Sequence, residues 1–171
     1  MERLLQDNLT LSRDRAAQAV GLALSVALLV GGLVSQVVAL VPLKIGNIDW
    51  EFGALGEVAA TGPLFLMGLG TTLFVATRSR RPGLVFGAGF LSLVWGLALV
   101  VGLVLLALDA PLLLTAAGAM APEPARAVKI VLAKSAGLMF IECLALVVLG
   151  VMGFRWWAAL RRSTVHLESG R

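Results

Sequence analysis

Four long apolar runs, separated by short charged segments, dominate the chain. They cover about residues 20–41, 59–77, 83–108 and 135–154. At about 1.5 Å per residue, each run is long enough as a helix to cross most of the roughly 30 Å hydrocarbon layer of a bilayer. None of them alternates with period two, as the strands of a membrane β-barrel do. The pattern therefore predicts an all-α membrane protein, with a single four-span domain over residues 1–171.

Prolines mark the expected helix ends. Pro42 directly follows the first run, and a proline disfavours helix in the residue before it. Pro63 lies inside the second run, so it occupies either the first helical turn or a kink in a longer helix that begins near Leu55. A short amphipathic segment, residues 124–134, precedes the fourth run.

Residues 1–19 carry acids as well as bases, and the run after them exceeds the roughly 7–15 apolar residues of a signal peptide. We therefore expect an uncleaved first span. It is preceded either by a short helix lying in the membrane interface or by a solvated tail.

The composition agrees with the apolar pattern. The chain is 59% hydrophobic and 14% charged, whereas soluble proteins average about 25% charged residues. No soluble surface with interleaved basic and aromatic residues is indicated, so we expect no nucleic-acid partner. Cys143 is the single cysteine and lies in an apolar run, which rules out a disulfide within the chain.

The basic residues are distributed asymmetrically. Ten of the 14 lysines and arginines fall in residues 1–19, 78–82 and 155–171, and four fall in the two intervening connections. Because basic residues stay on the cytoplasmic side, both termini are expected in the cytoplasm of a bacterium, with the protein in its inner membrane. The side chains expected to form this cytoplasmic basic edge are Arg78, Arg80, Arg81 and Arg155.

Small residues recur at every fourth position of the first run, at Ala23, Ala27, Gly31, Ser35 and Ala39. This spacing places them near one stripe of a helix, where another helix can approach closely. We call this set the small-residue stripe. Similar faces occur on the second run (Gly68, Thr72, Ala76) and on the third (Ala88, Ser92, Gly96), where we expect packing within the bundle. For the small-residue stripe, packing within the bundle and packing against another subunit are both left open.

Glu142 lies near the middle of the fourth run. An ionised carboxylate facing lipid is costly, so such residues usually face protein or water. Counting depth along opposed helices places Gln36 within about one turn of the same level. We predict a hydrogen bond between Gln36 and a protonated Glu142. Its role is either a clasp between the first and fourth helices or a proton-coupled site, and the clasp is favoured.

A group of polar and aromatic residues, Asp49, Trp50, Glu51 and Glu57, lies in the first outer connection, residues 42–58. Carboxylates can bind cations or act as acids and bases, but such residues more often form a solvated loop with an interfacial tryptophan, and that interpretation is favoured. His166 is the single histidine and lies in the polar tail, which excludes a histidine-based metal cluster and removes the usual axial ligand of haem from the membrane interior. We therefore predict no enzyme activity, no metal and no cofactor, with bound lipid the one ligand class left open.

One sequence pattern resembles a known family. Pro42-Leu43, Trp50-Glu51, Glu57 and Pro63-Leu64, followed by a glycine-rich span, are similar to the HpsJ-like family of small bacterial multi-span membrane proteins. The resemblance covers roughly residues 40–112. It implies a multi-span bacterial protein linked by its family name to hormogonium polysaccharide production, without any assigned chemistry.

Together these features predict a non-enzymatic inner-membrane protein that serves as an accessory or scaffold subunit of a larger complex. Photosynthetic, respiratory and envelope-assembly complexes fit equally well. The expected partners are other membrane subunits and lipids, and assembly with identical copies is left open. The alternative is a small proton-coupled transporter or channel that uses Glu142.

Overall fold

The computed structural model describes the backbone of residues 2–41, 44 and 47–168, and the side chains of 15–41, 44, 47 and 50–162. This part of the chain contains four helices and no strand. The helices are α1 (Glu2–Leu40), α2 (Ile48–Arg78), α3 (Pro82–Gly118) and α4 (Pro122–Glu168). Each includes a segment that is long and apolar enough to cross a membrane. The predicted all-helical architecture with four candidate spans is confirmed.

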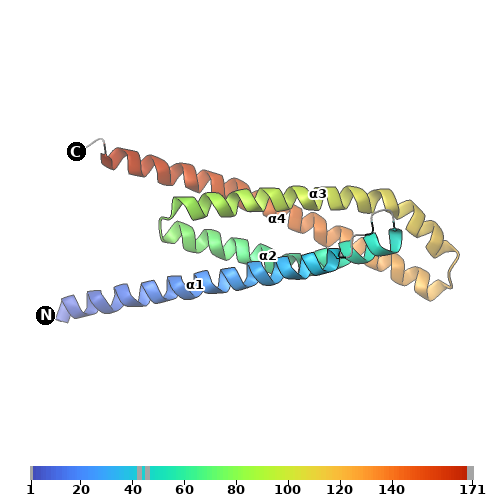
Figure 1. Ribbon diagram of the computed structural model, residues 1–171, viewed down its shortest axis with the longest axis horizontal. Helices are drawn as coiled ribbons and strands as arrows, with labels where there is room; N and C mark the ends of the chain where they lie inside the picture. The colour runs from blue at the N-terminus through green and yellow to red at the C-terminus, as the bar shows by residue number, and fades with distance from the viewer. Residues whose placement is uncertain (1, 42–43, 45–46, 169–171) are drawn as a thin grey trace.

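The four helices run side by side along the long axis of the molecule (Figure 1). The first turn of α1, the last turn of α4 and the α2–α3 turn lie at one end, and the other two connections lie toward the opposite end. α3 packs closely along α4, and α2 contacts all three other helices. Within the described residues, α1 approaches α2 alone. α2 is therefore central and α1 peripheral.

The helices extend beyond the predicted spans. α2 begins at Ile48, where the Asn47 side chain accepts a hydrogen bond of 3.0 Å from the Trp50 backbone N–H and caps the helix. Most of the predicted connection 42–58 is therefore helical. Pro63 and Pro111 both lie inside helices, because neighbouring helices hold a membrane helix together despite one missing backbone hydrogen bond.

Two expected short segments are parts of longer helices. The amphipathic stretch 124–134 belongs to α4, which begins at Pro122. The first helical positions need no N–H partner, so Pro122 and Pro124 are tolerated there. Residues 2–19 are likewise helical and continuous with α1.

The core lies where α2, α3 and α4 meet, with the large side chains Leu69, Leu73, Met139 and Leu146 almost fully buried. The α3–α4 contact depends on glycine. A Cβ atom at Gly153 would lie 2.8 Å from the Cα atom of Gly89, closer than carbon atoms can pack. Only glycine permits this approach.

Two of the three small-residue faces pack as expected. Gly68 and Ala76 of α2 are buried, with Thr72 partly buried, and Ala88, Ser92 and Gly96 of α3 are all buried. A Cβ at Gly68 would lie 3.0 Å from the backbone nitrogen of Leu29 in α1. A Cβ at Gly96 would contact the Leu146 side chain of α4 at 3.5 Å. Packing of these faces within the bundle is confirmed.

Candidate functional site

The small-residue stripe points away from the rest of the chain. Ala23, Ala27 and Gly31 are exposed, and Ser35 and Ala39 are partly exposed. A Cβ built on Gly31 has no atom within 4 Å outside its own helix, whereas one built on the adjacent Gly32 lies 3.2 Å from the backbone nitrogen of Phe65. Two neighbouring glycines therefore face opposite environments.

α1 packs against α2 through a different face, formed by Gly21, Ser25, Gly32 and Gln36. A Cβ at Gly21 would lie 2.9 Å from a methyl group of Val75. The Ser25 hydroxyl donates to the Leu22 carbonyl at 2.8 Å, so this side chain is satisfied within its own helix. This inward face was not predicted from the sequence. Gln36 is the residue that could have identified it, because a buried amide must face protein rather than lipid.

Gln36 and Glu142 are both buried, with 0% and 3% of their surfaces exposed. The predicted hydrogen bond between them is wrong. Within the described residues, neither the amide of Gln36 nor the carboxyl group of Glu142 has a hydrogen-bond partner. The reason is geometric: α1 approaches α2 and not α4, so the two side chains belong to different helix interfaces.

Glu142 lies against a notch in α2. Its carboxyl group occupies the space where a Cβ at Gly62 would lie. Pro63 follows directly and has no N–H, so the carbonyl of the buried Ala59 lacks its usual helical donor. The indole Nε1 of Trp95, whose ring lies 5.0 Å from that of Phe65, also lacks a partner in the described part of the chain. Unpaired polar groups thus gather around the central turns of α2.

The polar and aromatic residues predicted in the first outer connection lie on a helix rather than in a loop. Trp50, Glu51 and Glu57 lie on the first three turns of α2, and the Asp49 side chain lies outside the described residues. Glu51 shares a side-chain hydrogen bond with Asp109 of α3. Among the described side chains, no cluster of three or more potential metal ligands occurs.

The α2–α3 turn positions the basic edge. The Arg81 N–H donates to the Ala76 carbonyl at 3.0 Å and the Arg80 N–H donates to the Thr77 carbonyl at 3.1 Å. This is a Schellman ending, which requires a left-handed residue after the helix. Arg80 supplies it with φ of 51°, a position where glycine is usual. The turn leaves Arg78, Arg80 and Arg81 exposed, as is Arg155 on α4.

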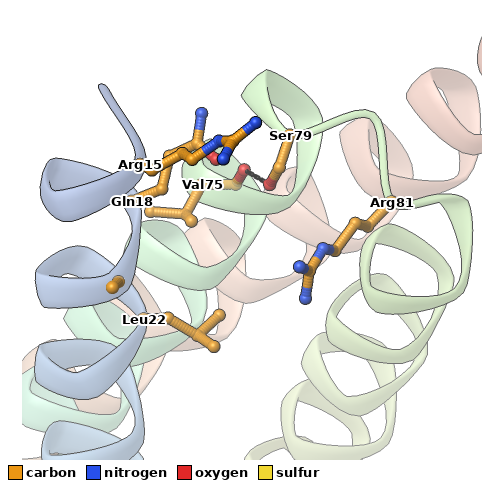
Figure 2. Close-up of a pocket in the computed structure, with 7 residues that line it drawn as sticks. Arg15, Gln18, Leu22, Val75, Ser79 and Arg81 are labelled. Atoms are coloured by element: carbon orange, nitrogen blue, oxygen red, sulfur yellow. Dashed lines mark hydrogen bonds between the residues drawn. The ribbon is translucent and has the colours of Figure 1, made fainter. Parts of the chain in front are cut away.

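A pocket of about 260 Å³ opens beside this turn (Figure 2). α1 contributes Arg15, Gln18, Ala19 and Leu22, α2 contributes Val75 and Ser79, and the residue before α3 contributes Arg81. On α4, the Arg161 guanidinium lies 4.8 Å from the centre of the Trp157 ring. This end of the bundle therefore combines exposed guanidinium groups with indole rings.

Comparisons with protein-family profiles, curated proteins and solved structures give no match to this chain. The resemblance to the HpsJ-like family stays a prediction.

Proposed function

We propose that this chain is a non-enzymatic subunit of a larger membrane complex, and that α1 docks on a transmembrane helix of another subunit. The observation that supports it is the orientation of the small-residue stripe. Ala23, Ala27 and Gly31 are exposed along α1, while the opposite face of the same helix packs on α2. A lipid-facing helix has no need of small side chains, whereas helix–helix contacts in membranes are enriched in them.

The proposal places the protein in a bacterial inner membrane, with both termini in the cytoplasm. The basic α2–α3 turn supports this orientation, because it lies at the same end of the bundle as the first turn of α1 and the last turn of α4.

The stripe proposal can be tested with two identical substitutions on different helices. Ala27→Leu fills the stripe, and Ala98→Leu adds the same bulk on an exposed position of α3. After mild detergent extraction, we expect the wild-type chain and Ala98→Leu to migrate with a stoichiometric membrane partner. Ala27→Leu should lower recovery of that partner by about tenfold, since added bulk in a close contact costs about 1–3 kcal/mol.

A photo-crosslinking residue at position 27 identifies the contact directly. It should join the partner, whereas the same residue at position 98 should react with lipid. A monodisperse wild-type monomer, or equal recovery from the two leucine variants, would contradict the docking role.

A second candidate function is proton-coupled transport through Glu142, favoured by a buried carboxyl group that has no hydrogen-bond partner among the described residues. Glu142→Gln separates the two functions, because the neutral amide cannot exchange a proton. In vesicles, a transporter should lose proton uptake with this substitution, whereas a packing subunit should show no uptake in either form and should keep its partner.

A further inference from the structure

The pocket at the arginine-rich end has a polar rim and an apolar floor. In Figure 2, Arg15 extends from α1 toward Ser79, and Arg81 extends from the opposite wall into the gap between the helices. The floor is formed by Leu22 and Val75. The Ser79 hydroxyl donates to the Val75 carbonyl, which leaves the hydroxyl proton occupied within α2.

No described acidic side chain balances these two arginines. Among the described side chains that line the pocket, there is no aspartate or glutamate. Glu51 and Asp109 pair near the start of α2, far along that helix from Ser79. Glu142 lies at the level of Gly62, more than four turns from Ser79 by residue spacing. Two guanidinium groups thus share one opening without a carboxylate from this part of the chain.

The pocket lies at the level of a membrane interface. Ser79 is the C-cap residue of α2. α4 runs parallel to α2, because Gly62 lies beside Glu142 and Leu73 lies beside Gly153. The same offset brings Ser79 level with the turn of α4 that carries Trp157 and Arg161. Tryptophan and arginine at such a level mark the headgroup region of a bilayer.

We propose that this pocket binds the phosphate group of an anionic phospholipid. Arg15 and Arg81 hold the phosphate oxygens through charge-assisted hydrogen bonds, since a guanidinium matches phosphate geometry with paired donors. The Gln18 amide supplies a further donor at the rim. One acyl chain lies along Leu22 and the face of α1 that continues from it, where Val26 and Val30 are exposed. Basic pockets between membrane helices are suited to such headgroups. This site is independent of the small-residue stripe.

The test uses the purified full chain in a neutral detergent, titrated with phosphatidylglycerol and followed by native mass spectrometry. Arg15→Gln with Arg81→Gln should weaken binding about 25-fold, because each basic residue near an anionic headgroup contributes about a factor of five. The matched control is Arg126→Gln with Lys129→Gln, which removes the same charge from exposed positions near the start of α4. This control should retain binding within about twofold of the wild type.

Two further measurements separate loss of binding from loss of folding, and headgroup recognition from binding of free phosphate. Arg15→Lys with Arg81→Lys preserves the charge and should recover most of the affinity, which a misfolded protein would not do. Phosphatidylcholine should not compete with phosphatidylglycerol, and inorganic phosphate should compete only weakly, since it lacks the acyl chain. Equal affinity of the glutamine pair and its control, equal binding of phosphatidylcholine, or full competition by inorganic phosphate would each overturn the proposal.

Discussion

The α3–α4 contact and the outward face of α1 both carry small residues, but their surroundings are opposite. On α3 and α4, Gly89 and Gly153 bring two backbones so close that a single added carbon atom cannot fit. On α1, Gly31 belongs to the small-residue stripe, and a Cβ atom there would meet nothing within 4 Å from the described part of the chain outside its own helix. The spacing of small residues therefore predicts that a helix can be approached closely. It does not predict whether the approaching helix belongs to the same polypeptide.

The adjacent pair Gly31 and Gly32 shows the same lesson over a single residue. Gly32 lies against the Phe65 backbone, and Gly31 faces outward. A rotation of about 100° between successive helix positions separates a contact that the chain makes for itself from one that needs a neighbour. In the sequence, Gln36 distinguishes the inward Gly32 from the outward Gly31. It lies four residues after Gly32, on the same face, and its amide is buried.

The largest effect should come from filling the α3–α4 contact. Gly153→Val places carbon atoms where the Gly89 backbone lies, so the helices must separate. We expect the free energy of unfolding to fall by about 3 kcal/mol, at the upper end of overpacking costs. The matched change Gly31→Val should alter it by less than about 0.5 kcal/mol, as surface changes do. Denaturant titration of both variants in detergent measures this difference, and similar losses in both would remove the contrast between the two regions.

An intermediate effect is expected on the inward face of α1. The Gln36 amide is fully buried and has no partner in the described residues, so it bears a desolvation cost with no hydrogen bond in return. Gln36→Met keeps the shape and removes that cost, which should raise the unfolding free energy by about 1–2 kcal/mol. A decrease in thermal stability would mean that the amide has a partner in the membrane, such as water, and would sharpen the case for a functional polar site beside Glu142.

The smallest effect should arise at the turn that joins α2 to α3. Arg80 adopts φ of 51°, which costs a residue with a Cβ about 1 kcal/mol. Arg80→Gly removes this cost but adds freedom to the unfolded chain, so a net gain of about 0.5 kcal/mol is expected. Arg80→Ala also removes the charge while keeping the Cβ. Thermal unfolding should show no gain for alanine, and an equal gain for both variants would assign the effect to charge instead.

The number and type of elements follow directly from hydropathy, since four apolar runs of membrane-spanning length became four helices. Their ends did not follow, because helix length was judged from the apolar residues alone. Asn47 caps α2 before the apolar run begins, and α3 continues through Pro111 to Gly118, although the predicted span ended at residue 108. Proline is a weak stop signal when neighbouring helices satisfy the freed backbone groups.

The level of Gln36 and Glu142 along the bundle was predictable from the sequence. Which neighbouring helix each side chain faces was not. Gly32 packs at Phe65, so antiparallel spacing brings Gln36 level with residue 61, and Glu142 lies against Gly62. The two polar side chains therefore lie at nearly the same level, as counting predicted. Which helix each one faces depends on the order of packing around α2, and a single sequence holds no direct record of that order.

In the described part of the chain α1 contacts α2 alone, and this affects how the fold opens. Peeling this helix away exposes one interface and leaves the mutual contacts of α2, α3 and α4 untouched. Its backbone amides should therefore exchange with deuterium sooner than those of the other three helices, as a unit that opens below the global unfolding threshold. A helix released in this way can pack against the α2 of another copy. Two chains that exchange α1 in this way form a domain-swapped dimer.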